Sequence, residues 1–182
     1  MVEGMNTLSI DELKAILAKG FHGKLYQKIA FEMTIRHDLL EASLPLLKEK
    51  GKIGMRYSWL IGGLLDMKPE LLNEYVDYFY QHLSEADFPN YDRSIAKLFY
   101  LADIPETLKG EAVNILFKWL NDPGISVSTK NYAALALCKL ADEIPDIRNE
   151  VILVLSEQQF KNKSSFEKLA AKLLIRQNKF KQ

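Results

Sequence analysis

The sequence is poor in the residue types that carry most protein chemistry. It holds a single cysteine, Cys138, so no disulfide can form within the chain, and we expect a reducing compartment. Cys138 lies in an apolar segment, where a thiol usually behaves as a small inert side chain. The three histidines, His22, His37 and His82, are not spaced as metal ligands. We therefore expect no metal, no cofactor and no nucleophilic cysteine.

Long apolar runs are also missing. No run approaches the ~18 residues of a membrane-spanning helix, and residues 1–7 lack the basic and apolar regions of a secretory signal. Residues 19–24 hold too few glycines for a phosphate-binding loop and follow a predicted helix, not a strand. Because no catalytic constellation is visible either, we expect a cytoplasmic protein that is not an enzyme and does not associate with membranes.

What the sequence does contain is a pattern of paired helices, clearest over residues 126–157. The first helix should begin near Ser126, whose hydroxyl can cap free N–H groups, and residues 132–138 are all apolar. A run so continuous predicts a helix buried between neighbours. Pro145 suits the first turn of a second helix. That helix carries one apolar stripe, formed by Ile147, Val151, Val154 and Leu155.

Copies of the corner between these two helices recur along the chain. Residues 101–106 and 140–146 share Leu-Ala-Asp and Ile-Pro, and residues 65–70 are a third version. A fainter copy at residues 36–39 has no proline. The corner aspartates are Asp38, Asp66, Asp103 and Asp142, spaced 28, 37 and 39 residues apart. Such periods indicate stacked helix pairs, each of which buries its apolar face against the next.

The pattern predicts one domain, residues 1–182, with about ten helices and no strand. Ser9 and Glu12 form a capping box that opens an unpaired helix ending at Gly20. Gly62 and Gly63 lower helix propensity, so we expect a neighbouring backbone to approach closely there. Both tryptophans, Trp59 and Trp119, fall on predicted core positions. The predicted units are a capping helix at about 9–19, repeats at about 22–51, 52–88, 90–123 and 124–160, and a terminal helix at about 164–178.

These paired helices, aspartate-proline corners and Ala/Leu-rich first helices resemble HEAT-like repeat proteins over residues 20–178. The resemblance implies a right-handed α-α superhelix, although prolines here occupy the corners rather than the interior of the first helix. The chain is also similar to short bacterial helical proteins that carry the label adenylosuccinate lyase. That label implies a glycine- and serine-rich signature loop with Met, Lys and Asn, and the sequence has no such stretch.

Charge is balanced in total but unevenly distributed. The first members of the predicted pairs and the terminal segment hold 16 basic and 6 acidic residues, over residues 22–37, 52–66, 91–103, 126–142 and 161–182. The second members hold 6 basic and 15 acidic residues, over residues 38–50, 67–88, 104–123 and 143–160. Second helices line the concave side in HEAT-like proteins, so the resemblance implies an acidic concave surface. The alternative is that both faces only keep the protein soluble.

Two functions fit this organisation. The first is a non-catalytic, monomeric interaction module that binds a protein or a peptide, possibly with a basic segment, on its curved face. The alternative is nucleic-acid binding, as in the HEAT-like DNA glycosylases, which needs a basic and aromatic surface. The acidic second helices argue against it. The basic residues left for it lie at the C-terminal end: Lys161, Lys163, Lys168, Lys172, Arg176, Lys179 and Lys181.

The predicted second helix of the second repeat, residues 70–85, is the candidate partner-binding element. At about 100° per residue, its core-facing side consists of Leu72, Val76, Phe79 and Leu83. On the opposite side lies a set that we name the acidic stripe: Glu70, Glu74, Asp77, Gln81 and Glu85. Tyr78 and Tyr80 border the stripe. Either these rings contact a basic partner through cation–π interactions, or they pack against adjacent helices and the carboxylates only solvate the face.

Overall fold

The computed structural model describes residues 8–20, 23–86, 88–162 and 164–179. Over these ranges the protein has ten α-helices, four short 3₁₀ segments and no strand, which confirms the all-helical prediction. The expectation about a signal at residues 1–7 lies outside the described residues. The elements are α1 (Ile10–Lys19), α2 (Lys24–Ile35), α3 (His37–Ser43), η1 (Leu44–Lys48), α4 (Lys52–Met67), η2 (Pro69–Tyr75), α5 (Val76–Gln81), η3 (His82–Ser84), α6 (Tyr91–Leu101), α7 (Glu106–Asn121), α8 (Val127–Glu143), η4 (Pro145–Ile147), α9 (Arg148–Gln158) and α10 (Ser164–Lys179).

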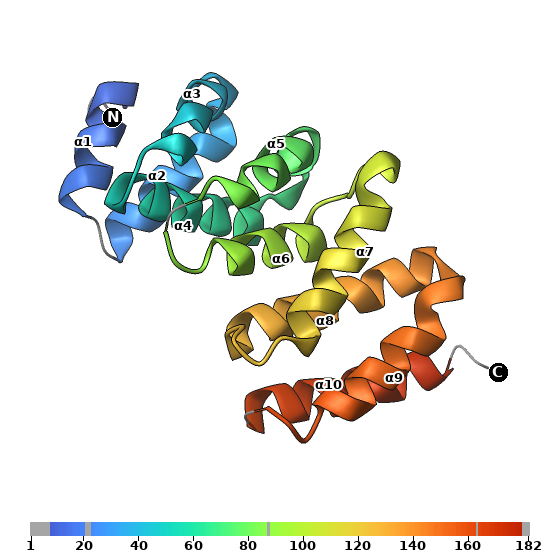
Figure 1. Ribbon diagram of the computed structural model, residues 1–182. Coiled ribbons are helices and arrows are strands. Elements are labelled where there is room, and N and C mark those ends of the chain that lie inside the picture. The colour runs from blue at the N-terminus through green and yellow to red at the C-terminus, as the bar shows by residue number, and fades with distance from the viewer. Residues whose placement is uncertain (1–7, 21–22, 87, 163, 180–182) are drawn as a thin grey trace.

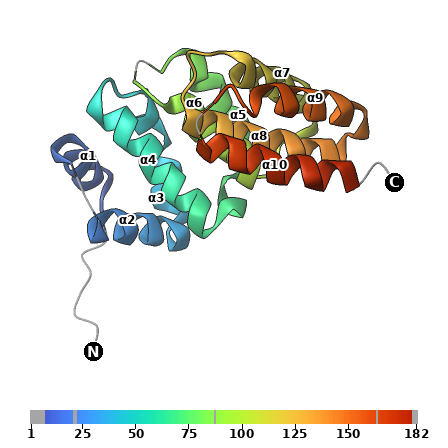
Figure 2. The same cartoon turned by 90° about the horizontal axis from the view of Figure 1, so that it is seen from below.

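The helices form an elongated stack, with α1 and α10 at opposite ends (Figure 1). The even-numbered helices make a row in which α2 packs against α4, α4 against α6, α6 against α8 and α8 against α10. The remaining elements connect these helices and pack beside them, and Figure 2 shows α7 and α9 on one side of α8 and α10. None of the helices in the described ranges has the length and apolar character needed to cross a membrane.

Local capping explains where α1 begins and ends. The Ser9 hydroxyl accepts a hydrogen bond from the Glu12 N–H, and the Glu12 carboxylate accepts one from the Ser9 N–H, so the predicted capping box is present. Gly20 ends the helix with a φ of 105°, a backbone conformation that favours glycine. The same logic starts α8, where the Ser126 hydroxyl accepts from the Thr129 N–H.

The second elements of the first two pairs are not the continuous helices that the sequence pattern predicts. After α3 the chain continues as the 3₁₀ segment η1, because Pro45 has no N–H to donate to the carbonyl four residues earlier. Residues 69–84 form η2, α5 and η3 in succession. In η2 Leu72 is buried, and the exposed side chains are those of Glu70 and Glu74.

The core follows the apolar pattern, with one exception. The apolar run of α8 is inside the stack, where Cys138 and most of its neighbours are fully buried. Trp119 is buried as expected, but Trp59 is 44% exposed, so its assignment to the core was wrong. Neither α2 nor α6, the neighbours of α4 in the row, covers the Trp59 side chain fully. Helical spacing alone does not show how much of a helix its neighbours cover.

Basic side chains of the row bind the corners of the preceding pairs, and we name these interactions the corner contacts. The Lys97 ammonium of α6 donates to the Asp66 carboxylate and to the Gly62 carbonyl, both at 2.7 Å. In the next pair, Lys139 donates to the Ala102 carbonyl at 2.5 Å and lies 3.9 Å from the Asp103 carboxylate. Arg176 of α10 pairs with Asp142. Three of the four corner aspartates therefore connect one pair to the next.

Close approaches along α4 occur at two glycines. A Cβ built on Gly54 would lie 2.3 Å from the Glu49 carbonyl oxygen, so it is here that a backbone approaches. At Gly63 the neighbour is a side chain, since a Cβ would lie 2.5 Å from the Tyr26 hydroxyl, and Gly62 has open space around it. The predicted close approach of a backbone at Gly62–Gly63 is therefore wrong in its position and in its partner.

Because the three glycines of α4 have different surroundings, Gly→Ala substitutions at these positions should change the free energy of unfolding by different amounts and in different directions. Gly54→Ala should destabilise the protein by about 3 kcal/mol or more, because a backbone carbonyl cannot move aside. Gly63→Ala should cost about 1 kcal/mol, since the Tyr26 ring has to shift from its place. Gly62→Ala should stabilise by about 0.5–1 kcal/mol through helix propensity. Urea unfolding followed by circular dichroism measures all three, and equal effects at the three positions would contradict this interpretation.

Candidate functional site

The acidic stripe lies on the surface of η2, α5 and η3. All five of its side chains, Glu70, Glu74, Asp77, Gln81 and Glu85, are exposed. On the core-facing side of the same segment, Leu72, Val76 and Phe79 are buried and Leu83 is partly buried. The segment still has a buried side and an exposed side although part of it is 3₁₀ helix. Three of the four core-facing residues, Val76, Phe79 and Leu83, belong to α5 and to η3, which continues it.

The two bordering tyrosines are half-buried and held in place by neighbours. The Tyr78 hydroxyl donates to the Leu44 carbonyl at 3.0 Å, and its ring lies 4.3 Å from the His82 ring. Tyr80 packs its ring 5.6 Å from that of Phe99. Burial raises the pKa of Tyr80, and the carboxylate of Glu111 on α7 raises it further. Both residues thus contact adjacent elements and stay partly exposed.

A third tyrosine, Tyr75, belongs to the same surface but was missed in the sequence. Its hydroxyl donates to the Glu41 carboxylate of α3 at 3.4 Å. Burial raises the pKa of Tyr75 to about 12, and the negative charges of Glu74 and Glu41 add to the effect. No pattern within residues 70–85 could have found this contact, because Glu41 lies 34 residues away in the sequence.

Tyr75 and Tyr80 therefore connect carboxylates from three successive second elements. We name this group the carboxylate–tyrosine cluster: Glu41 of α3, Glu74 and Tyr75 of η2, Tyr80 of α5 and Glu111 of α7. The cluster extends the acidic stripe sideways over the neighbouring pairs. It turns a stripe on one segment into a surface on which an extended partner could lie.

The negative charges of this surface are not neutralised by the protein itself. Throughout the described ranges, no lysine or arginine lies within ion-pair distance of Glu41, Glu70, Glu74, Asp77 or Glu111. The pattern is reversed on the row of even-numbered helices, where the corner contacts occupy Lys97, Lys139 and Arg176. Some carboxylates of the second elements do pair, as Glu106 and Glu143 do with Lys109, but those of this surface have no lysine or arginine partner in the described ranges.

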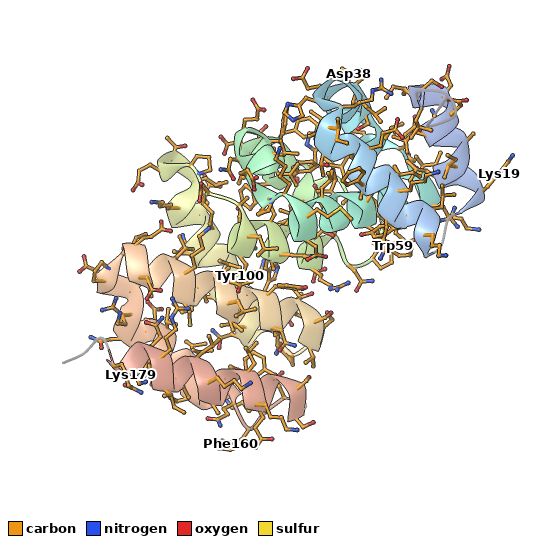
Figure 3. All side chains as sticks on the ribbon, turned by 180° about the vertical axis from the view of Figure 1, so that it is seen from behind. Lys19, Asp38, Trp59, Tyr100, Phe160 and Lys179 are labelled. Carbon is orange, nitrogen blue, oxygen red and sulfur yellow. The ribbon has the colours of Figure 1, made fainter. Side chains whose placement is uncertain are left out.

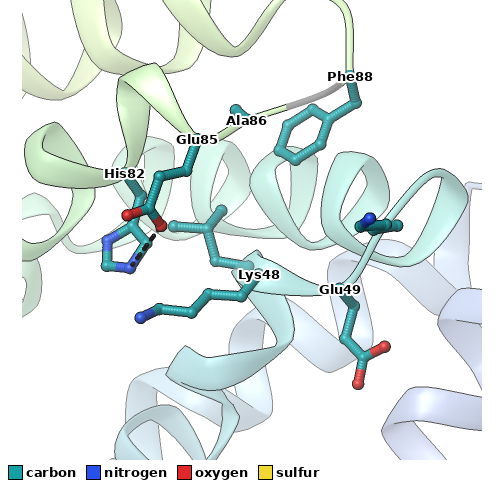
Figure 4. Close-up of a pocket in the computed structure, with 8 residues that line it drawn as sticks. Lys48, Glu49, His82, Glu85, Ala86 and Phe88 are labelled. Carbon is teal, nitrogen blue, oxygen red and sulfur yellow. Dashed lines mark ion pairs between the residues drawn. The ribbon is translucent and has the colours of Figure 1, made fainter.

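One end of the acidic stripe opens into a cleft of about 310 Å³ between η1 and η3 (Figure 4). His82 donates through Nδ1 to the Tyr78 carbonyl at 2.6 Å, and its Nε2 lies 3.8 Å from the Glu85 carboxylate. Lys48 and Lys50 line the same cleft. Since cations are present here, the uncompensated part of the stripe is its other end, from Glu70 to Asp77.

The remaining candidates from the sequence form no reactive centre in the part of the chain that the structure describes. No group of three His, Cys, Asp or Glu side chains that could hold a metal is found there, and His22 lies outside it. Cys138 is buried, and this burial raises the pKa of its thiol to about 12, so the thiol stays protonated at neutral pH.

No protein-family model, no curated protein and no solved structure matches this chain. The resemblance to HEAT-like repeat proteins therefore stays a prediction that rests on the helix pairs and their corners. A function for the chain has to be argued from the surfaces described above.

The raised pKa of Tyr75 predicts how stability depends on pH in the alkaline range. A folded-state pKa of about 12 against an ordinary value of about 10 means that the folded protein favours the neutral phenol. This contribution is fully present below pH ~10 and is lost as the pH rises toward 12. Tyr75→Phe should therefore make the fall in melting temperature between these pH values less steep.

Glu41→Gln serves as the matched variant, because it keeps the ring and removes one of the nearby negative charges. It should also make the alkaline loss of stability smaller, while melting temperatures near pH 8 change little. Identical pH profiles for the wild type and both variants would contradict the assigned cause.

Proposed function

We propose that the chain is a non-catalytic interaction module that binds a basic protein or peptide segment on the acidic stripe and the carboxylate–tyrosine cluster. The observation that supports it best is the set of exposed carboxylates with no cationic partner in the described residues. Exposed like charges repel one another, so an arrangement of this kind is relieved when a cationic partner approaches.

The proposal includes the arrangement of the pairs as a HEAT-like right-handed α-α superhelix. The row from α2 to α10 supports it, since each even-numbered helix packs against the next one, and the first residues of successive helices are 28 to 39 residues apart. In such a stack the second elements form one continuous surface, and an extended partner can contact several of them at once.

Half-buried tyrosines make this surface suitable for arginine and lysine. A guanidinium that lies over the face of the Tyr75 or Tyr80 ring can pair with Glu74 or Glu111 at the same time. Cation–π and exposed ion-pair contacts contribute about 0.5–1 kcal/mol each. Several contacts are needed for useful affinity, so we expect a partner with more than one basic residue.

Nucleic-acid binding, the alternative, is less well supported. Several cations of the row are occupied, because Arg56 donates to the Leu17 and Ala18 carbonyls while Lys97 and Lys139 make corner contacts. At the C-terminal end, Arg176 pairs with Asp142, Lys163 and Lys181 lie outside the described residues, and the exposed lysines are Lys161, Lys168, Lys172 and Lys179. Four exposed lysines at one end of the chain support only weak, salt-sensitive binding.

Charge reversal in the stripe tests the proposal. The double variant Glu74→Lys/Asp77→Lys should weaken the binding of a fluorescently labelled octa-arginine peptide by about tenfold or more, since attraction is replaced by repulsion. Fluorescence anisotropy measures the affinity. Folding should be unaffected, because exposed substitutions usually change stability by less than about 0.5 kcal/mol.

The matched control is Asp11→Lys/Glu157→Lys, which makes the same change in net charge at exposed positions on α1 and α9. This control should bind the peptide as the wild type does at moderate salt. Equal weakening in both double variants would show that only net charge matters, and the stripe would then be a solvating face.

A further inference from the structure

A second cleft, separate from the acidic stripe, lies between three helices of the row. It has a volume of about 210 Å³ and is lined by side chains from α2, α4 and α6. The residues that matter below are Trp59 and Asp66 of α4 and Arg93, Ser94 and Lys97 of α6. The cleft is polar and aromatic, and none of its residues belongs to the proposed peptide-binding surface.

Arg93 provides a cation that the described part of the protein does not neutralise. Its guanidinium carbon lies 5.8 Å from the centre of the Tyr132 ring, and no carboxylate is within ion-pair distance in the described ranges. The Tyr132 ring restricts the guanidinium without using its hydrogen-bond donors. A guanidinium with free donors is suited to phosphate, which it can bind through two parallel hydrogen bonds.

Trp59 provides a planar apolar surface at the edge of the cleft (Figure 3). Its side chain is 44% exposed, although most large apolar side chains of the molecule are buried. The Tyr26 hydroxyl donates to the Trp59 carbonyl at 2.6 Å and so fixes the backbone of the tryptophan. An indole ring held in this way can stack on a flat heteroaromatic group, and tryptophan and arginine are the residues most enriched where binding energy concentrates.

Asp66 provides a hydrogen-bond acceptor in the same cleft. Its Oδ2 accepts from the buried Lys97 ammonium, which compensates the negative charge, and the side chain remains 64% exposed. Oδ1 makes no such contact with Lys97 and is able to accept hydrogen bonds from hydroxyl groups. Trp59 and Asp66 are seven residues apart, which corresponds to about 10 Å along α4, so a ligand of the size of a mononucleotide is long enough to contact both.

We propose that this cleft binds a mononucleotide. Its phosphate lies on Arg93, its ribose hydroxyls donate to Asp66 Oδ1, and its base stacks on Trp59. The Asp66 carboxylate fixes the direction of binding, because Oδ1 accepts hydrogen bonds from the sugar hydroxyls and has no hydrogen to donate to the phosphate. This site does not depend on the proposed peptide-binding surface, and either could exist without the other.

Isothermal titration calorimetry of the full chain with adenosine 5′-monophosphate tests the proposal, with adenosine and inorganic phosphate as partial ligands. The whole nucleotide should bind at least about tenfold more tightly than either part, since both anchors act together. Arg93→Gln should weaken the nucleotide about tenfold and leave adenosine unchanged. Trp59→Leu should weaken both the nucleotide and adenosine.

Arg93→Lys keeps the charge and should restore part of the affinity, while Lys172→Gln on α10 removes an exposed cation elsewhere and should change nothing. Melting temperatures close to the wild type confirm that the variants fold. Nucleotide affinity that is no higher than that of phosphate, or that is insensitive to Arg93→Gln, would overturn the proposal. An oligoadenylate that binds more tightly than the nucleotide through the same two residues would overturn a free nucleotide as the ligand.

Discussion

The corner contacts are the interaction on which the rest of the structure depends. A lysine or arginine of one even-numbered helix reaches back to an aspartate, and for Lys97 and Lys139 also to a carbonyl, at the corner of the preceding pair. The Ala102 carbonyl follows the last residue of α6, where carbonyls lack partners within the helix and carry partial negative charge, so a cation is favourable there. Lys97 is 8% exposed, and its removal would take away the cation that pairs with the Asp66 carboxylate. Packing brings the pairs together, and these contacts fix the register between them.

The same contacts explain why charge is distributed so unevenly in the sequence. The excess of basic residues on the first helices of each pair is used inside the stack, at Lys97, Lys139 and Arg176. Of the acidic residues on the second elements, Glu106 and Glu143 pair with Lys109, whereas Glu41, Glu70, Glu74, Asp77 and Glu111 have no lysine or arginine partner in the described ranges. The two faces therefore differ in the sign of their charge and also in how many of their charges are paired.

Features determined within a few neighbouring residues could be predicted from the sequence. The capping box at Ser9, the helix restart at Pro145 and the burial of α8 all follow from local chemistry. The sequence could not show that Pro45 and residues 69–75 tighten into 3₁₀ geometry, or that Trp59 is exposed. The exposure of Trp59 depends on how far the neighbouring helices extend, and apolar spacing does not distinguish 3₁₀ from α geometry over a few residues.

Sites that combine several helices were the hardest to predict. The contact of Tyr75 with Glu41 joins residues 34 apart, and the second cleft draws on residues from Tyr26 to Lys97. The acidic stripe could be found because it lies on one segment. Its extension over α3 and α7 could not, because the offset between pairs varies along the chain and a shift of one residue turns a side chain to another face.

Helices of the row make their extensive contacts with the next helix along, and this has a consequence for how the protein responds to damage. Coupling between nearest neighbours means that a local loss of structure weakens the adjacent pair directly and more distant pairs only through it. The two ends, each with a neighbour on one side only, are then the natural starting points for partial unfolding, and α6 and α8 in the interior are the last to lose their order. How readily a helix unfolds on its own thus depends on its position along the stack.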